Sequence, residues 1–238
     1  MVYHPWREGS LKLLYGSAFR APSVYERYYA APPNIANPAL HPETIRTYEA
    51  VWEQGFGVRR SVSVSYFQSR IANLIDQESL PDGSIQYVNK DKVRSEGMEL
   101  YGKTDLTKDM SGHLGYTIQS TRVSGGDRMS NSPTHTAKLG LSRRSARGKA
   151  RVSAEGFLIS SRTTFQGGSL PPAAVLNLNV RVQPWWEGLT VYGGVFNVLD
   201  AAYSASGAAE NAQADIPQDG RNFNVGLEYR FGRPYEKP

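Results

Sequence analysis

Apolar and polar residues alternate one by one in many short segments of this chain, and the clearest segment is 220–231. Its apolar positions are Phe223, Val225, Leu227, Tyr229 and Phe231. Successive side chains of a strand point to opposite faces, so the pattern predicts a strand with one apolar and one polar face. Aromatic and branched residues favour strand over helix. Such a strand suits a barrel wall with lipid on one side and water on the other.

The same alternation recurs along the chain and predicts about ten strands of a length that suits tilted membrane strands. No helical period competes with it. The predicted strands are centred on residues 10–19, 44–54, 59–71, 93–105, 114–118, 137–142, 151–158, 176–183, 189–195 and 220–231. The predicted fold is therefore all-β, with meandering antiparallel strands.

The connections between these strands alternate in length. Short turns lie near 55–58, 106–111, 145–149 and 184–188. Long loops lie near 20–43, 72–92, 123–133, 161–172 and 200–219. Short turns at one end and long loops at the other are typical of an outer-membrane barrel, whereas a soluble sandwich has no reason to sort its loops. We expect an antiparallel transmembrane β-barrel; in a soluble β adhesin, the alternative, the asymmetry would be coincidence.

Composition narrows the function. The chain has 238 residues, of which 39% are hydrophobic and 21% charged, so it is not a disordered protein. It has no Cys and only 4 His, which argues against thiol chemistry, a zinc site or any cofactor. Ser is abundant, but the sequence shows no set of Ser, His and acidic residues in a context typical of an enzyme. The net charge is +5, but Lys and Arg are spread along the chain, so nucleic acid is not an expected partner.

Four motifs, in order, resemble those of the TonB-dependent outer-membrane receptors. The first joins Phe19-Arg20-Ala21-Pro22 to Asn37-Pro38-Ala39-Leu40-His41-Pro42-Glu43 and Tyr48-Glu49. The second runs from Tyr87-Val88-Asn89 through Arg94-Ser95-Glu96-Gly97-Met98-Glu99-Leu100. The third is Val195-Phe196-Asn197-Val198-Leu199-Asp200-Ala201-Ala202-Tyr203. The fourth leads from Pro217-Gln218-Asp219-Gly220-Arg221 into the strand that ends at Phe231. The residues that carry the resemblance are Phe19, Pro22, Asn37, Pro38, Glu43, Glu49, Asn89, Arg94, Gly97, Glu99, Asn197, Asp200, Tyr203, Gly220, Arg221 and Phe231.

The resemblance implies a barrel of about 22 strands filled by an N-terminal plug domain. Such receptors import scarce nutrients with energy passed on by TonB. We expect residues 1–238 to be the C-terminal portion of such a barrel, a fragment with its last strand at 220–231 and a short tail at 232–238. The outer edge of that strand is expected to be open, or paired with Leu11–Phe19 in a smaller closure.

The expected function follows from the same resemblance. The chain would belong to a receptor of the bacterial outer membrane, in contact with outer-membrane lipid and served by the TonB system through a plug that this chain lacks. Its ligand would be a ferric siderophore, or else cobalamin. Haem is disfavoured, because no His lies between Pro22 and Asn37. The alternative is an autotransporter-type or passive pore-forming barrel.

The candidate ligand-binding residues lie in or beside the first long loop: Arg20, Tyr25, Arg27, Tyr28 and Tyr29. Aromatic rings and guanidinium groups suit planar, anionic iron–siderophore complexes. In the alternative interpretation the tyrosines pack the loop and Arg20 pairs with Glu43 or Glu49. Six further charges are expected to face the lumen and form structural ion pairs: Arg94, Glu96, Glu99, Arg181, Glu228 and Arg230.

Overall fold

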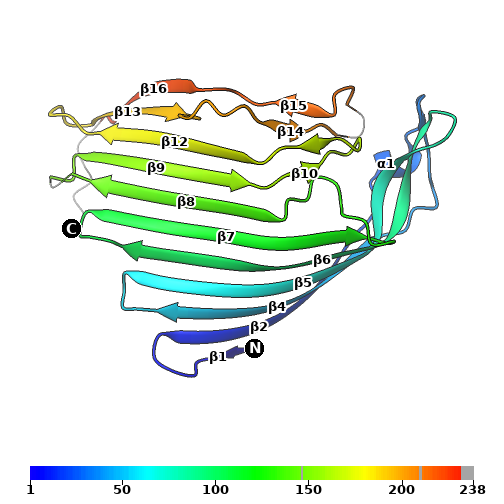
Figure 1. Ribbon diagram of the computed structural model, residues 1–238, viewed down its shortest axis with the longest axis horizontal. Helices are drawn as coiled ribbons and strands as arrows, with labels where there is room; N and C mark the ends of the chain where they lie inside the picture. The colour runs from blue at the N-terminus through cyan, green and yellow to red at the C-terminus, as the bar shows by residue number, and fades with distance from the viewer. Residues whose placement is uncertain (146, 209–210, 232–238) are drawn as a thin grey trace.

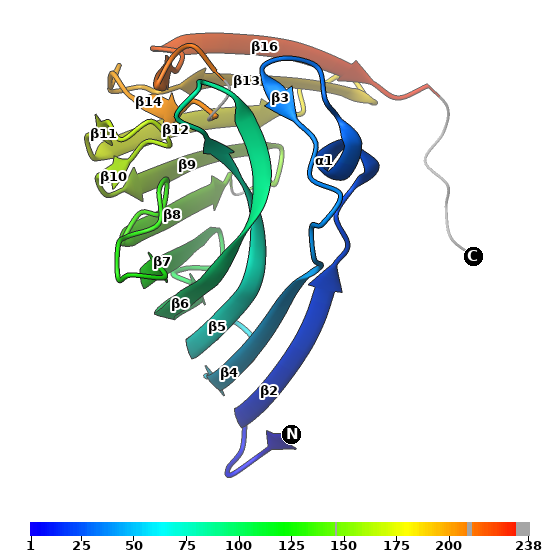
Figure 2. The same cartoon turned by 90° about the vertical axis from the view of Figure 1, so that its right-hand side faces the viewer.

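The computed structural model describes residues 1–145, 147–208 and 211–231, and it contains one large curved antiparallel sheet (Figures 1 and 2). The main path of the sheet is β1-β2-β4-β5-β6-β7-β8-β9-β12-β13-β16, so consecutive long strands are neighbours. The long strands are β2 (Gly9–Arg20), β4 (Glu43–Gly55), β5 (Arg60–Ser79), β6 (Ile85–Asp105), β7 (Met110–Val123), β8 (His135–Arg144), β9 (Ala150–Ile159), β12 (Ala173–Val182), β13 (Leu189–Phe196) and β16 (Asn222–Tyr229). The meander of about ten strands predicted from the sequence is confirmed.

Short elements decorate the edge and the loops. They are β1 (Val2–Tyr3), α1 (Val24–Tyr28), β3 (Asn34–Ile35), β10 (Arg162–Thr163), β11 (Ser169–Leu170), β14 (Ser204–Ser206) and β15 (Asp215–Pro217). β1 pairs with the edge of β2, and β3 pairs in parallel with β6. The pairs β10–β11 and β14–β15 form small sheets of their own. None of these elements was predicted from the sequence, because strands of two or three residues and a helix of five residues are too short to show a period.

Two boundaries differ from the sequence prediction. The region 72–92 was expected to be a polar loop, but β5 and β6 continue through it and turn only around Gly83, where φ is +84°. Their pairing extends to Ser79 and Ile85, beyond the other strands (Figure 1). The last strand is shorter than 220–231: β16 ends at Tyr229, and Phe231 packs edge-on against that tyrosine with ring centroids 4.8 Å apart. The predicted tail 232–238 lies outside the described residues.

One face of the sheet collects the apolar residues. Residues that are direct partners on neighbouring antiparallel strands share a face. Tyr66 is opposite Met98, and Met98 is opposite Ile118. The same face continues through β7 to β16, and its large side chains include Tyr48, Tyr66, Met98, Leu100, Tyr116, Ile118, Leu139, Leu158, Leu178, Val180, Phe223, Val225 and Leu227. All of these are exposed, so this convex face is apolar without a protein layer to cover it.

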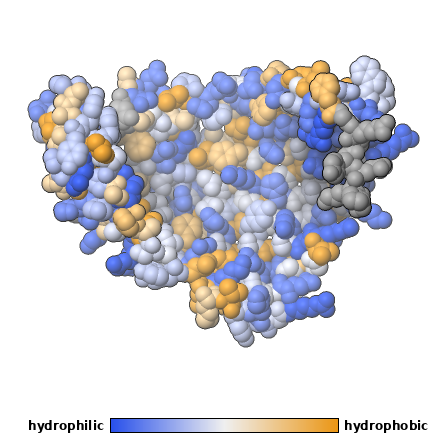
Figure 3. All heavy atoms as spheres, turned by 180° about the vertical axis from the view of Figure 1, so that it is seen from behind, coloured by the Kyte–Doolittle hydropathy of each residue, from blue (hydrophilic) through white to orange (hydrophobic). Residues whose placement is uncertain are grey.

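The opposite face is concave and more polar. Figure 3 shows this hollowed side from behind, with hydrophilic and weakly hydrophobic side chains over most of its middle. Glu99, Arg181 and Glu228 lie on it, since each alternates with an apolar residue of the convex face. Arg181 is 3.0 Å from the Glu228 carboxylate, and Arg230 is also 3.0 Å from it. The predicted inner placement of Glu99, Arg181 and Glu228 is confirmed, and so is the ion pairing of Arg181 and Arg230 with Glu228. Glu99 makes no ion pair in the described structure.

The predicted inner placement of Arg94 and Glu96 was wrong. Both share the parity of Met98 and therefore lie on the convex face, where Arg94 is 2.8 Å from Glu96. Charge alone suggested the lumen for both residues. Strand parity decides the face instead. Arg94 and Glu96 lie on the long-loop side of the apolar row formed by Tyr66, Met98 and Ile118, where the convex face becomes polar.

The sheet does not close. Among the described residues β16 pairs only with β13, and β1 is the last strand at the other end. Figure 2 shows the curved wall with β2 and β16 at its two separate margins. The predicted open edge is therefore confirmed, and the predicted pairing of the last strand with Leu11–Phe19 does not occur. The fold is a partial barrel.

The two ends of the wall differ as predicted. The long connections and the β5–β6 extension lie at one end, on the right in Figure 1, and short turns join the strands at the other. Trp185 and Trp186, in the turn between β12 and β13, are 82% and 66% exposed. Trp is typical of a membrane–water interface. No helix in the described part of the chain has the length and hydrophobicity needed to cross a membrane.

Candidate ligand-binding site

The first long loop contains a short helix with a well-formed start. The Ser23 hydroxyl accepts a hydrogen bond from the Glu26 backbone N–H, and the Glu26 carboxylate accepts one from the Ser23 N–H. This reciprocal capping box satisfies two amides that the first turn leaves unpaired. Pro22 precedes the cap and favours extended backbone before it. The local sequence therefore explains why α1 begins at Val24.

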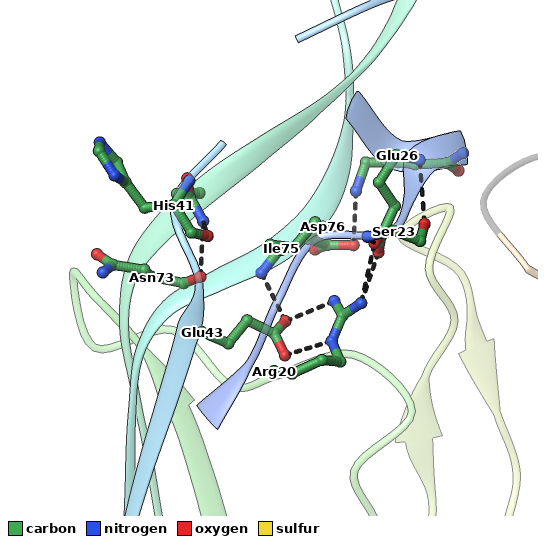
Figure 4. Close-up of polar contacts among 10 residues, drawn as sticks. Arg20, Ser23, Glu26, His41, Glu43, Asn73, Ile75 and Asp76 are labelled. Atoms are coloured by element: carbon green, nitrogen blue, oxygen red, sulfur yellow. Dashed lines mark hydrogen bonds and ion pairs between the residues drawn. The ribbon is translucent and has the colours of Figure 1, made fainter. Parts of the chain in front are cut away.

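Arg20 joins this helix to the barrel wall (Figure 4). Its Nε and Nη2 donate to the two Glu43 oxygens at 2.7 and 2.9 Å, and its Nη1 donates to both Glu26 oxygens at 2.8 and 3.0 Å. Glu43 also accepts the Ile75 backbone N–H at 2.7 Å. The guanidinium is thus held between two carboxylates whose side chains are only 13% and 15% exposed. Arg20 fixes α1 to β4.

The alternative interpretation of Arg20, pairing with Glu43, is confirmed; Glu49 is not its partner in the described structure. Most of the hydrogen-bonding capacity of the guanidinium is used inside the protein. Direct contact of Arg20 with a ligand stays a prediction, and the structure gives this residue a positioning role first.

Two of the three predicted tyrosines, Tyr25 and Tyr29, lie against each other, and Tyr28 is the last residue of the same short helix. The rings of Tyr25 and Tyr29 are stacked, with centroids 4.5 Å apart and planes 20° apart. Tyr87, from the β5–β6 extension, meets Tyr25 edge-on at 6.2 Å. Tyr25, Tyr28 and Tyr29 are 51%, 56% and 41% exposed. The loop therefore presents an aromatic surface at the long-loop end of the barrel, with ring faces available to a planar ligand.

Arg27 turns inward from the same helix. Its Nη2 donates to the Leu40 carbonyl at 3.1 Å, and its Nε is buried without a hydrogen-bond partner in the described structure. Leu40 itself is 1% exposed. Arg27 is therefore packed under the loop, and its contact with a ligand stays a prediction.

Two asparagines of the family motifs fasten the loop to the β5–β6 extension. Asn37 donates to the Tyr87 carbonyl at 2.9 Å. Asn89 accepts the His41 N–H at 2.8 Å and donates to the carbonyls of His41 and Asn73 at 3.0 and 2.8 Å. Both amides join the first long loop to β6, and Asn89 also binds the Asn73 carbonyl, where positive φ interrupts the regular backbone of β5. These motif residues therefore have structural roles around the aromatic surface.

We expect Glu43→Gln to loosen this loop. The neutral amide weakens the bidentate pair with Arg20, and charged hydrogen bonds of this kind contribute about 1.5–3 kcal/mol, less where the partner is half exposed. Hydrogen exchange of residues 20–43 should quicken about tenfold. The matched control is Glu49→Gln, on the same strand and face but without an ion pair in the described structure. Equal exchange in the two variants would contradict the role of Arg20.

The loop should also respond to acid. Burial alone would raise the pKa of Glu26, but hydrogen bonds from the Ser23 N–H and the Arg20 guanidinium outweigh it and hold the pKa below its usual value. A lowered pKa contributes stability above the unfolded value, about 4.3, that is lost as pH falls through the folded value. Exchange in 20–43, corrected for intrinsic rates, should stay constant from pH 7 to 5 and rise below about pH 4. Glu26→Gln should reduce this rise; loosening with rising pH would contradict the prediction.

The third and fourth motifs meet at one polar node. Asn197 is 3% exposed and has φ of +48°. Its amide donates to the carbonyls of Ala201 and Asp219 at 2.9 and 3.2 Å, and accepts the Ala201 N–H at 2.9 Å. The Asp200 carboxylate accepts the Arg221 N–H at 2.8 Å, so both ends of the 201–219 loop are held together. The node sets the entry into β16.

Other motif residues have simpler places. Phe19 is 76% exposed and lies on the convex face in line with Tyr15. A Cβ at Gly97 would come within 2.5 Å of the Ile118 carbonyl, so this position requires glycine. In the described residues no three His, Asp or Glu side chains gather in a group that could hold a metal ion.

An open, curved wall of antiparallel strands, apolar outside and polar inside, with long loops at one end, defines a portion of an outer-membrane-type barrel. Residues 1–198 match the family model described as TonB dependent receptor-like, beta-barrel. The chain belongs to this family. A search of curated proteins gives no match.

The solved structures that share this fold are those of longer chains. The ferric-catecholate import receptor Fiu from E. coli K12 is 20% identical, with a TM-score of 0.75, over 97% of this chain and 34% of that one. The FrpB iron transporter from Neisseria meningitidis is 18% identical (TM-score 0.73), over 96% and 38%. The copper transporter OprC is 17% identical (TM-score 0.75), over 93% and 37%. The chain thus spans about a third of the length of these proteins, and identities this low show the fold alone.

Proposed function

We propose that this chain is the C-terminal portion of an outer-membrane receptor barrel that takes up a ferric siderophore with energy from TonB. The observation that supports it most is the exposed aromatic surface of Tyr25, Tyr28 and Tyr29 at the long-loop end. Ring faces there suit stacking with a planar, aromatic iron chelator. The family match favours a receptor over an autotransporter or a passive pore.

The division of labour within the loop follows from its contacts. The tyrosines offer rings to the ligand, while Arg20, Glu26 and Glu43 hold the helix that carries two of them. The names of the similar structures include an iron transporter, a ferric-catecholate receptor and a copper transporter. A catecholate complex offers both planar rings and negative charge, so it fits the aromatic surface better than a bare metal ion.

Growth on defined iron sources tests the proposal. A strain that lacks its other siderophore receptors receives the complete gene, and growth is scored with ferric catecholate, ferric hydroxamate, cobalamin or copper as the limiting nutrient. Growth on a ferric siderophore alone is the expected result. No growth on any iron source, or growth on cobalamin or copper alone, would contradict it.

Variants tie the phenotype to the aromatic surface. Tyr25→Ala with Tyr29→Ala should weaken binding of the ferric siderophore about tenfold or more, since each stacked ring contributes roughly 0.5–1.5 kcal/mol. The matched control is Tyr3→Ala, which removes a tyrosine of similar exposure, 56%, at the short-turn end of the wall. If the double variant and the control bound the siderophore with equal affinity, Tyr25 and Tyr29 would not be part of the binding site.

A further inference from the structure

Four arginines stand side by side on the convex face, one on each of four neighbouring strands. Arg46 on β4 is the direct partner of Arg70 on β5, Arg70 of Arg94 on β6, and Arg94 of Arg122 on β7. We call these four residues the arginine row. Arg128, in the next loop, forms an isolated bridge with Arg122 and continues it. At a strand spacing of about 4.8 Å, the row spans roughly 14 Å across the sheet.

This register is unfavourable for the protein alone. Like charges directly opposite each other on neighbouring strands repel, and here the repulsion repeats at three successive pairs. The described residues offer little neutralisation: Arg94 pairs with Glu96 at 2.8 Å, while the side chains of Arg46 and Arg70 have no ion pair or hydrogen bond. All four side chains are exposed. An anion outside the chain would relieve this repulsion.

The position of the row indicates which anion. It lies toward the long-loop end, and the next positions on the same face lead through Tyr48 and Gln68 to Tyr66 and Met98. The distance from Arg70 to Tyr66 is four residues, about 13 Å along the strand. A partner of the row must therefore place negative charge against the arginines and an apolar part against the side chains beside them. A lipid has this arrangement at the border between headgroup and hydrocarbon.

We propose that the arginine row binds the phosphate groups of phosphorylated lipids in the leaflet next to the long loops. Guanidinium groups bind phosphate oxygens through paired, charged hydrogen bonds, and several at one spacing favour a headgroup with more than one phosphate. The proposal rests on the membrane placement under the proposed function, but not on the identity of the imported nutrient. It makes the row a lipid-anchoring surface that is separate from the aromatic surface of the loop.

The test uses the protein as its gene encodes it, purified in detergent. Native mass spectrometry follows binding of a bisphosphorylated glycolipid, of the same lipid without its phosphates, and of the first lipid in competition with inorganic phosphate. The double variant Arg70→Gln, Arg94→Gln should bind the phosphorylated lipid about 25-fold more weakly, at roughly fivefold for each charge. Arg70→Lys, which keeps the charge, should retain most of the binding.

The matched control is Arg60→Gln. Arg60 is on the same strand and face as Arg70 but at the short-turn end, opposite Thr104. It should bind the lipid like the unchanged protein. Equal loss in Arg60→Gln, equal binding of the dephosphorylated lipid, or displacement of the lipid by millimolar inorganic phosphate would overturn the proposal.

Stability without lipid separates binding from folding. In lipid-free detergent the double variant should unfold at the same or a higher temperature, because it relieves the repulsion within the row. A lower unfolding temperature would assign the row a structural role and overturn the proposal. Failure of the unchanged protein to support growth on a ferric siderophore would overturn the proposed cargo but would leave the lipid measurement unaffected.

Discussion

Leu178→Arg should destabilise the lipid-inserted protein by about 2–4 kcal/mol, the cost of a guanidinium near the bilayer midplane on the outer face of a barrel. Leu178 lies near the middle of β12 on the convex face, opposite Ala154 on β9 and Val195 on β13. It has no charged partner among these neighbours. The measurement is denaturant unfolding of the complete protein from lipid vesicles.

The neighbouring position supplies the control for this prediction. Asn179 is one residue further along β12 and faces the concave side. Arginine there meets the watery interior, so Asn179→Arg should change the stability by less than about 1 kcal/mol. Equal losses at the two positions, or a larger loss at Asn179, would mean that the convex face does not meet lipid.

Asn197→Ala should lower the free energy of unfolding by about 3 kcal/mol. The substitution leaves the Ala201 N–H and the carbonyls of Ala201 and Asp219 without their partner, in a place where Asn197 is 3% exposed. It also forces alanine into φ of +48°, which asparagine tolerates far better. Chemical denaturation measures the loss.

Two variants locate the origin of this effect. Asn197→Gly keeps the backbone freedom and loses only the hydrogen bonds, so it should be less destabilised than Asn197→Ala. Asn224→Ala, on the concave side of β16, removes an exposed amide that makes no side-chain hydrogen bond in the described structure, and should stay within about 0.5 kcal/mol. A full-sized loss in Asn224→Ala would show that the measurement does not report on the node.

The alternation of residue types was sufficient to predict the wall. Period two at segments such as 61–66 and 176–182 identifies strands and assigns each side chain to a face, because a strand has only two faces. The same parity, applied to Arg94 and Glu96, places them on the convex face. Their charges alone predicted the lumen. The arginine row was not predicted, because its four members become neighbours only once the register is known.

The loop site was less accessible from sequence. The Arg20 pair with Glu43 could be foreseen as an alternative, since both residues end adjacent strands. The ion pair between Arg20 and Glu26 could not be predicted, because it depends on where α1 lies against the wall. A five-residue helix leaves no periodic signal in the sequence. The stacking of Tyr25 on Tyr29 follows from their spacing of four along the same turn. The edge contact of Tyr25 with Tyr87 depends on the β5–β6 extension. That extension was not predicted, because the polar residues of 72–92 indicated a loop.

The node at Asn197 shows why the motifs were recognisable without their roles being predictable. Sequence resemblance marked Asn197, Asp200, Gly220 and Arg221 as a set. Asn197, Asp200 and Arg221 close the loop 201–219 by side-chain hydrogen bonds, which no local pattern records. Gly220 leaves room for the Asp200 carboxylate, which would lie 2.8 Å from a Cβ at that position. The motifs of this family therefore indicate loop anchors in this chain as much as ligand contacts.

Whether the convex face meets lipid and the concave face meets water can be measured with introduced cysteines, since this chain has none of its own. Single cysteines at positions 176 to 180 of β12 are labelled with a fluorophore in the complete protein, which is then inserted into vesicles of brominated lipid. Strong quenching is expected at 176, 178 and 180, which face lipid, and little at 177 and 179, which face water. Quenching that does not alternate, or that is strongest at 177 and 179, would contradict this assignment of the two faces.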